Sequence, residues 1–200
     1  MFYYLEGTVS IVAQNLAVID IGGAGYACAV TLNTISHLET GKKARLYTYC
    51  NIKEDAFDLY GFFDLSEKRC FELLIAVSGV GPKAALAILS SCSPESLALA
   101  IINNDERALT MAPGVGKKLA QRVILELKDK MAQNSMELKA SGFVSPGATA
   151  VGTKKEGDAA AALAVLGYSQ GEIAAALRGL DTENLSVEEI IRLVLKNSLK

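Results

Sequence analysis

Two short glycine-containing segments of this sequence carry residue types that bind phosphate groups. The first is Gly79-Val80-Gly81-Pro82-Lys83, and the second is Gly114-Val115-Gly116-Lys117-Lys118, 35 residues further along the chain. A helical pattern precedes and follows each copy, so the sequence predicts two helix–turn–helix units in tandem. Glycine permits a positive φ and a close approach of another backbone, as a tight turn that faces a ligand requires.

Each turn is predicted to leave backbone N–H groups unpaired at the start of the next helix, where the helix dipole adds partial positive charge. Pro82 suits the first helical position, because its missing N–H is not needed there. The lysines that follow both turns add ammonium groups beside the same anion, and such contacts read no bases. The predicted phosphate-binding residues of the two turns are Gly79, Val80, Gly81, Lys83, Gly114, Val115, Gly116, Lys117 and Lys118.

Arg122 is a further candidate for phosphate binding. It lies four residues after Lys118 and therefore shares that face of the predicted helix. We expect its guanidinium to reach the same nucleic acid backbone. The alternative is a surface ion pair with Glu126, which again follows at a spacing of four residues.

The first turn also satisfies a nucleotide-binding fingerprint. The residues from Gly79 to Ala84 match G-x-G-x-x-A, which binds dinucleotides when it follows a strand and precedes an acidic residue by about 20 positions. Here the flanking residues are helical in pattern, and residues 97–102 contain no acid. Neither lysine-containing turn continues into the Ser or Thr that a nucleotide-hydrolysing phosphate loop requires. An NAD-dependent enzyme is therefore the weaker alternative, and no cofactor is expected.

Residue types that support other catalytic chemistry are sparse. The cysteines stand at positions 28, 50, 70 and 92 without a C-x-x-C pair, and the only histidine is His37. No metal site is therefore expected, the cysteines are predicted to be buried apolar residues, and His37 is predicted to lie on the surface in a short turn. A structure-selective nuclease, the second alternative, would need clustered carboxylates for metal ions, and Glu54, Asp55 and Asp58 form the local candidate group.

Composition and hydrophobic spacing divide the 200 residues into segments. Half of the residues are hydrophobic, which excludes wholesale disorder, and the net charge of −2 argues against a protein that coats nucleic acid along its whole length. Residues 1–64 indicate five short strands and a small closed barrel of the OB-fold type. The expected strands are residues 2–12, 16–21, 26–32, 44–52 and 58–63.

The rest of the chain is predicted to be mainly helical. Residues 65–133 have helical spacing, with N-caps expected at Ser66, Ser93 and Asp105, and carry nine basic and seven acidic residues. Residues 134–155, rich in Ser, Gly and Pro, indicate a flexible linker. The sequence also predicts three helices in residues 156–200, two of them opened by capping boxes, Ser169 with Glu172 and Ser186 with Glu189. Because no secretory leader or run of 18 apolar residues is visible, a cytoplasmic protein is expected.

Taken together, these segments resemble the RuvA family, the Holliday junction-binding subunits of bacterial branch migration complexes. The resemblance covers essentially the whole chain, although the linker and the C-terminal segment match in organisation more than in motif. The sharpest matches are Lys53-Glu54-Asp55-Ala56, Leu59-Tyr60-Gly61-Phe62 and the two glycine segments described above.

The resemblance implies a fold and a division of labour. Residues 1–64 would form an OB-fold domain for oligomerisation and the junction core, and residues 65–133 a tandem helix-hairpin-helix domain for DNA binding. The linker at 134–155 would lead to a three-helix, UBA-like docking domain at 156–200. The implied function is sequence-independent binding of four-way DNA in recombination and repair, without a catalytic site in this chain.

The resemblance also implies roles for an acidic turn and for partners. Glu54 and Asp55 would form a pin near the centre of the junction that repels backbone phosphates, whereas the residues alone favour an ordinary solvated acidic turn. The chain would assemble as a homotetramer, with one or two tetramers on each junction. Residues 156–200 would bind RuvB, a hexameric ATPase that makes the complex an ATP-dependent helicase, and the resolvase RuvC would act on the same junction.

Overall fold

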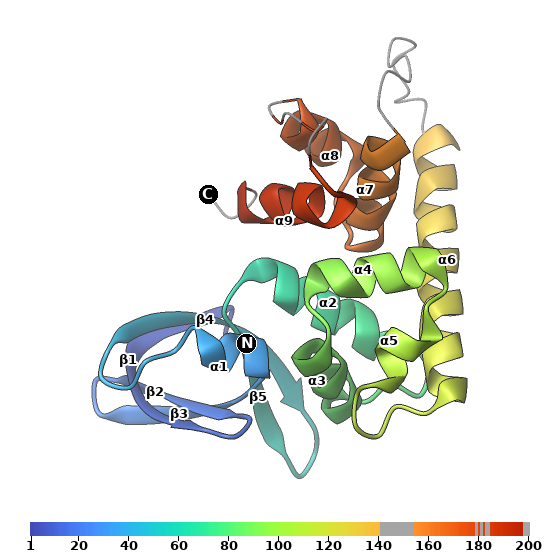
Figure 1. The fold of residues 1–200 in the computed structure, drawn as a ribbon. Helices are drawn as coiled ribbons and strands as arrows, with labels where there is room; N and C mark the ends of the chain where they lie inside the picture. Colours follow the sequence, from blue (N-terminus) through green and yellow to red (C-terminus); the bar gives the residue numbers. More distant parts are fainter. Residues whose placement is uncertain (141–153, 179, 181, 183–184, 198–200) are drawn as a thin grey trace.

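Five strands at the start of the chain close into a barrel, and the helices that follow pack beside it (Figure 1). The computed structural model describes residues 1–140, 154–178, 180, 182 and 185–197. The expected architecture of an N-terminal five-stranded barrel, a central helix-hairpin-helix region and a C-terminal helical region is confirmed.

The barrel has the strand order β1-β2-β3-β5-β4. Its members are β1 (Tyr4–Ala13), β2 (Leu16–Ile21), β3 (Ala24–Val30), β4 (Lys43–Ile52) and β5 (Phe57–Phe62). Adjacent strands are antiparallel except β3 and β5, which run parallel and close the barrel. Alternate side chains point inward, so that Leu5, Val9, Ile19 and Leu46 fill the barrel core. The strand ends lie within two residues of the expected ones.

A short helix that the sequence analysis did not predict follows β3. The expected strand continued to Leu32, but the structure ends β3 at Val30 and begins helix α1 (Leu32–Ser36). The reason is Thr31, whose hydroxyl accepts a hydrogen bond from the backbone N–H of Thr34 and so caps the helix. His37 follows the helix and is exposed, as expected, with its ring stacked on that of Phe63.

Five further helices, α2 to α6, form what we call the hairpin domain. They are α2 (Leu65–Ile75), α3 (Pro82–Ser91), α4 (Pro94–Asn103), α5 (Glu106–Thr110) and α6 (Lys117–Ala140). The predicted N-caps at Ser93 and Asp105 are confirmed. The predicted N-cap at Ser66 is wrong: Asp64 caps α2, because its extended backbone aims the carboxylate at the N–H of Glu67, at 2.7 Å.

The expected linker at 134–155 overlaps helical residues at both of its ends. Helix α6 continues to Ala140 and helix α7 begins at Lys154, whereas residues 141–153 lie outside the described residues. The sequence from 134 to 140 contains Met136, Glu137, Leu138 and other good helix formers, which favours extension of α6 beyond the expected boundary.

The three C-terminal helices pack against the hairpin domain. They are α7 (Lys154–Val165), α8 (Gln170–Leu177) and α9 (Val187–Asn197); α7 lies against α4 and α6, α9 lies against α4, and α8 packs on α7 and α9 (Figure 1). Leu163 and Ile190 are fully buried in the same apolar core as the hairpin-domain side chains. The Arg69 guanidinium on α2 also lies 4.7 Å from the centroid of the Tyr168 ring, a cation–π contact between the two regions.

Both predicted capping boxes are present in this C-terminal region. The Ser169 hydroxyl accepts from the backbone N–H of Glu172, and the Glu172 carboxylate accepts from the Ser169 backbone. Ser186 and Glu189 repeat the arrangement at the start of α9. Hydrogen bonds from Ser169 hold the pKa of Glu172 below its ordinary value, since they stabilise the ionised carboxylate.

The cysteines are mostly interior residues, as predicted. Cys28, Cys70 and Cys92 are buried, Cys50 is half-buried, and none of the four forms a disulfide. Burial raises the pKa of the Cys28 thiol to about 12 and that of the Cys70 thiol well above its ordinary value. Among the described residues, no single helix is long and apolar enough to cross a membrane; α3 and α4 meet those criteria only as a pair bent by 96°.

Candidate nucleic-acid interface

The sequence repeat is also a repeat of backbone geometry. Gly79 and Gly114 occupy equivalent positions and have φ angles of +85° and +81°, in the left-handed region that favours glycine. The N–H of Val80 donates to the carbonyl of Val77 at 3.0 Å, and the N–H of Val115 donates to that of Ala112 at 3.1 Å. The two turns, residues 76–81 and 111–116, therefore share one conformation, and we call them the glycine turns.

The valines at the centre of the glycine turns have buried side chains. Val80 and Val115 are both 5% exposed, with their side chains in the core of the hairpin domain. Their N–H groups are used inside the turns by the hydrogen bonds described above. The valine side chains therefore anchor the turns to the core, and the role of these two residues in phosphate binding stays a prediction.

The last glycine of each turn stands immediately before a helix. Gly81 is the N-cap of α3 and provides no side-chain hydrogen bond to the first-turn amides, and Gly116 directly precedes α6. A Cβ atom built on Gly81 or Gly116 meets no atom within 4 Å, so both positions face open space. The N–H groups at these helix starts thus have no capping side chain from the preceding residue, which is the geometry that binds an anion.

The first glycine turn is held against helix α6 through contacts at Ser78. The Ser78 N–H donates to the Glu126 carboxylate at 3.2 Å, and Arg122 Nη1 donates to the Ser78 carbonyl at 3.3 Å. Arg122 and Glu126 both belong to α6, the helix that the second turn opens. Arg122 thus holds the first turn in place, a contact that neither the predicted phosphate role nor the alternative ion pair included. Its position beside Gly79 keeps the guanidinium at the turn surface.

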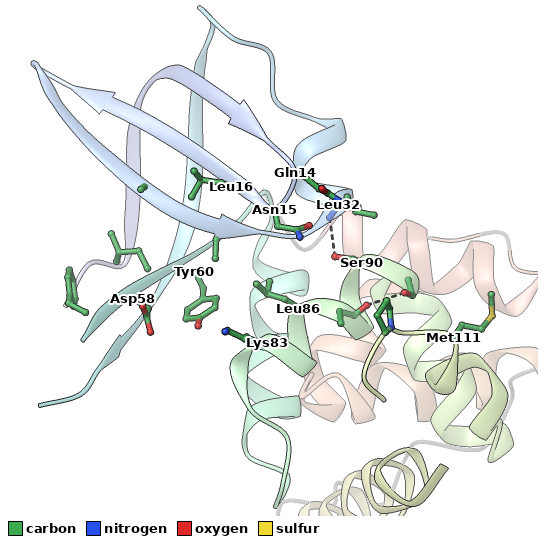
Figure 2. Close-up of a pocket in the computed structure, with 17 residues that line it drawn as sticks. Gln14, Asn15, Leu16, Leu32, Asp58, Tyr60, Lys83, Leu86, Ser90 and Met111 are labelled. Carbon is green, nitrogen blue, oxygen red and sulfur yellow. Dashed lines mark hydrogen bonds between the residues drawn. The ribbon is translucent and has the colours of Figure 1, made fainter. Parts of the chain in front are cut away.

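The lysines around the glycine turns have different surroundings. Lys117 and Lys118 are exposed at the start of α6, and Lys117 lies 3.8 Å from the Glu106 carboxylate. Lys83 lines a cleft of about 900 Å³ between α3 and the barrel, together with Asp58 and Tyr60 of β5 (Figure 2). The structure therefore brings the predicted lysines to the two turns, with Lys83 on the side of α3 that faces the barrel.

The acidic turn lies where the sequence analysis expected it. Glu54 and Asp55 are exposed in the turn between β4 and β5, which a hydrogen bond from the Lys53 N–H to the Ala56 carbonyl closes at 2.8 Å. In Figure 1 this turn extends toward the same lower edge of the molecule as the turn between α5 and α6. The acidic turn and the second glycine turn therefore lie toward one side of the protein.

Several residues of the interface were not found by sequence reasoning. Ser78 and Glu106 have no motif of their own, and only the spacing of four between Arg122 and Glu126 was visible in advance. Lys128 donates to the Ile102 carbonyl at 2.9 Å and so caps the end of α4. These contacts join helices that are distant in sequence, and hydrophobic periodicity gives no signal for them.

Neither enzymatic alternative gains geometric support. The first glycine turn follows helix α2, whereas the dinucleotide fingerprint requires a strand at that position. Within the described part of the chain, no group of three His, Cys, Asp or Glu side chains is arranged to hold a metal ion. The Asp58 carboxylate of the candidate nuclease group accepts a hydrogen bond from Asn51 at 3.3 Å.

Comparison with known proteins gives matches along the chain. Residues 1–61 match the model of the RuvA N-terminal domain, residues 71–129 that of the SAM-like helix-hairpin-helix tandem, and residues 154–199 that of the RuvA C-terminal domain. Two similar proteins, each named Holliday junction branch migration complex subunit RuvA, come from Acetivibrio thermocellus and Symbiobacterium thermophilum. They are 41% and 43% identical to this chain over 98% of its length and 98% of their own. A third, from Streptomyces coelicolor, is 47% identical over 66% of each chain.

The backbone of the glycine turns predicts a contrast in stability between their two glycines. Gly79→Ala should lower the free energy of unfolding by about 1–2 kcal/mol, because a Cβ disfavours the left-handed conformation. Gly81→Ser should leave it unchanged or raise it by a few tenths of a kcal/mol, since the φ of −86° suits a serine N-cap. Urea denaturation followed by circular dichroism measures both values, and equal losses in the two variants would contradict this description of the turn.

Proposed function

The chain belongs to the RuvA family, and we propose that it binds four-way (Holliday) junction DNA as the non-catalytic subunit of a branch migration complex. The observation that carries this proposal is the pair of glycine turns, each of which opens a helix without a capping side chain. Phosphate oxygens would accept hydrogen bonds from the amides at these helix starts, and the nearby lysines would add positive charge.

This mode of binding is independent of base sequence. Backbone amides and lysine side chains at the glycine turns would contact phosphates, which are the same for every base pair. Gly81 and Gly116 would allow the DNA backbone to approach, because no side chain occupies the space in front of either helix. Arg122 would add charge at the edge of the first turn while it holds the Ser78 carbonyl.

The acidic turn supplies discrimination between junction and duplex. Carboxylates at Glu54 and Asp55 repel phosphates, so a continuous duplex laid across them would be disfavoured. At an open junction the strands diverge at the crossover, and the acidic turn could occupy the space between them. We propose that this pair acts as a pin that keeps the strands apart at the centre of the junction.

The partners follow from the same family membership. The subunit would act with RuvB, with the C-terminal helices within residues 156–200 as the docking region, and the complex with that ATPase would move the branch point as an ATP-dependent helicase. A homotetramer would place four pairs of glycine turns around one junction and would concentrate their basic residues on one face, which offsets the net charge of −2. RuvC would act on the junction held in this way.

The central test gives α3 and α6 the N-cap side chains that glycine does not provide. Gly81→Asp combined with Gly116→Asp gives each helix a side chain that takes its own amides and repels phosphate, so binding to junction and duplex should fall by about 100-fold at matched salt. The same pair changed to asparagine caps the amides without added charge and should lose less. Gel-shift titration of a four-way junction and a linear duplex of the same sequences measures both; undiminished binding by the aspartate variant would disprove the site. Cleavage of the wild-type complex with Mg²⁺ would support the nuclease alternative instead.

Lys118→Ala should flatten the salt dependence of binding. Removal of one lysine–phosphate interaction lowers the slope of log K against log salt by about 0.9. Lys42→Ala is the matched control, because Lys42 lies on the barrel in an ion pair with Glu39. An unchanged slope for the Lys118 variant would remove this residue from the interface.

Neutralising the acidic turn should weaken discrimination. In the double variant Glu54→Gln and Asp55→Asn, duplex binding should tighten by about five- to tenfold because the repulsion of phosphates is removed. Junction binding should change less, and the ratio of the two dissociation constants is the readout. The idea of a pin fails if the variant and the parent show the same ratio.

A further inference from the structure

A buried carboxylate, Glu67, lies where the barrel meets the hairpin domain. It belongs to the first turn of α2 and has 0% of its surface exposed. Its Oε1 accepts hydrogen bonds from the Thr31 hydroxyl and, at 3.3 Å, from the Asn33 amide, and its Oε2 accepts from the Thr34 hydroxyl at 2.6 Å. All three donors belong to residues 31–34, at the start of α1. A single side chain of the hairpin domain therefore accepts all three hydrogen bonds from this segment.

The oxygen atoms of the two threonine hydroxyls already accept hydrogen bonds from backbone N–H groups. The Thr34 oxygen already accepts from the backbone N–H of Phe63 at 2.9 Å, and the Thr31 oxygen accepts from the N–H of Thr34 at 3.0 Å. Each hydroxyl therefore directs its proton to Glu67, and each is itself buried. Loss of the carboxyl group would leave two buried hydroxyl donors without acceptors, which is costly in a dry interior.

A second contact fixes the same helix to the barrel one turn further along. The Phe71 ring lies 5.1 Å from that of Tyr60, 4.9 Å from that of Phe62 and 5.3 Å from that of Tyr49, measured between ring centroids. Phe71 and Glu67 are separated by four residues and thus share one face of α2. Helix α2 is therefore attached to the barrel by a polar contact at its start and by an aromatic contact at its middle.

Stability alone does not explain why a carboxyl group is buried at position 67. Burial raises the pKa of Glu67 despite the hydrogen bonds from Thr31 and Thr34, because desolvation disfavours the charged form. An apolar side chain could fill a comparable site without that desolvation penalty, although it could not accept three hydrogen bonds in fixed directions. What the carboxyl adds is a directional connection between two elements that carry different parts of the DNA interface.

From this arrangement we infer that Glu67 is a positioning residue, which sets the angle between the barrel and the hairpin domain so that the acidic turn and the glycine turns meet the same junction. The inference rests on the proposed junction binding. The acidic turn connects β4 and β5. Phe63 follows β5 in the chain, its N–H donates to the Thr34 hydroxyl, and α2 begins two residues later. The first glycine turn follows the other end of α2. A change in the tilt of α2 would therefore move the first glycine turn relative to the acidic turn.

The test separates junction preference from duplex binding. Duplex is bound by the glycine turns and disfavoured by the acidic turn, whereas the preference for a junction depends on how these two features are placed relative to each other. Glu67→Ala should misplace the acidic turn and so reduce the ratio of duplex to junction dissociation constants by about tenfold, without a parallel fall in both affinities. Glu67→Gln keeps the shape and one acceptor oxygen but places an NH₂ group against the other threonine hydroxyl, so it should restore the ratio only in part.

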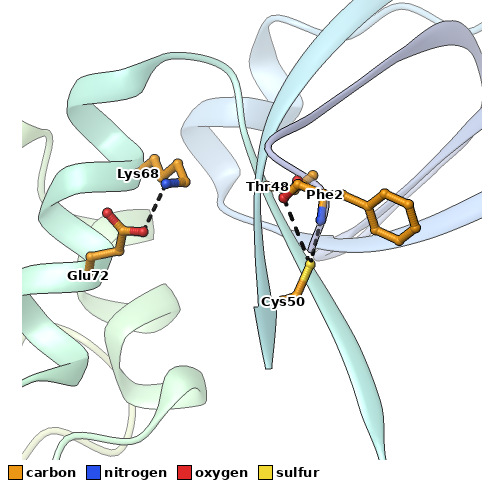
Figure 3. Close-up of polar contacts among 5 residues, drawn as sticks. All are labelled: Phe2, Thr48, Cys50, Lys68 and Glu72. Atoms are coloured by element: carbon orange, nitrogen blue, oxygen red, sulfur yellow. Dashed lines mark hydrogen bonds and ion pairs between the residues drawn. The ribbon is translucent and has the colours of Figure 1, made fainter. Parts of the chain in front are cut away.

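Two further variants complete the experiment. Glu72→Ala is the matched control on the same helix, because Glu72 is partly exposed and pairs with Lys68 at 2.8 Å (Figure 3); it should leave the ratio unchanged. Thr34→Val removes the hydroxyl that donates to Glu67 and accepts from the Phe63 N–H, with little change of volume, and it should lower the ratio in the same direction if the alanine variant fails to fold. All titrations are made on variants shown by circular dichroism to be folded at the temperature used.

The outcomes are distinguishable. If folded Glu67→Ala or Thr34→Val keeps the wild-type ratio, or if duplex and junction affinities fall in parallel, the positioning role is wrong while junction binding stands. If the wild-type protein itself shows no preference for the junction, the proposed function fails first. A lowered ratio that glutamine partly restores supports the inference, since a general loss of stability would not alter selectivity alone.

Discussion

A helix can bind an external anion through its first amides only while no group of its own chain occupies them. Six of the described helices, α1, α2, α4, α5, α8 and α9, begin with a hydroxyl or carboxylate that accepts from their own first-turn N–H groups. Helices α3 and α6 follow glycine instead. Six helices are thus capped by their own side chains, whereas the two that the proposed interface uses begin after a residue with no side chain.

The second organising feature is helix α2, which every major part of the molecule contacts. Its Glu67 and Phe71 face the barrel, its Leu74 enters the core of the hairpin domain, and its Arg69 lies over a tyrosine ring of the C-terminal region. An uncapped turn binds DNA usefully only if it is held at a defined place. Arg122 and Glu126 supply that constraint locally, and α2 supplies it between domains.

Local patterns predicted the elements well and the contacts between them poorly. The barrel strands, the N-caps at Ser93 and Asp105 and both glycine turns were visible, because each depends on residues close together in sequence. Ser66 was mistaken for the cap of α2 because two adjacent polar residues compete there and only the backbone angles of Asp64 decide between them. The inward direction of Val80 and the partners of Glu67 depend on segments up to 36 residues apart, which periodicity does not reveal.

The buried thiols divide between the two interiors of the molecule. Cys28 lies in the barrel core, whereas Cys70 and Cys92 lie in the core that the helices share. A thiol with a raised pKa that is shielded from solvent reacts slowly with alkylating reagents until its surroundings open. The order in which these cysteines are alkylated would therefore show whether the barrel core or the core shared by the helices opens first.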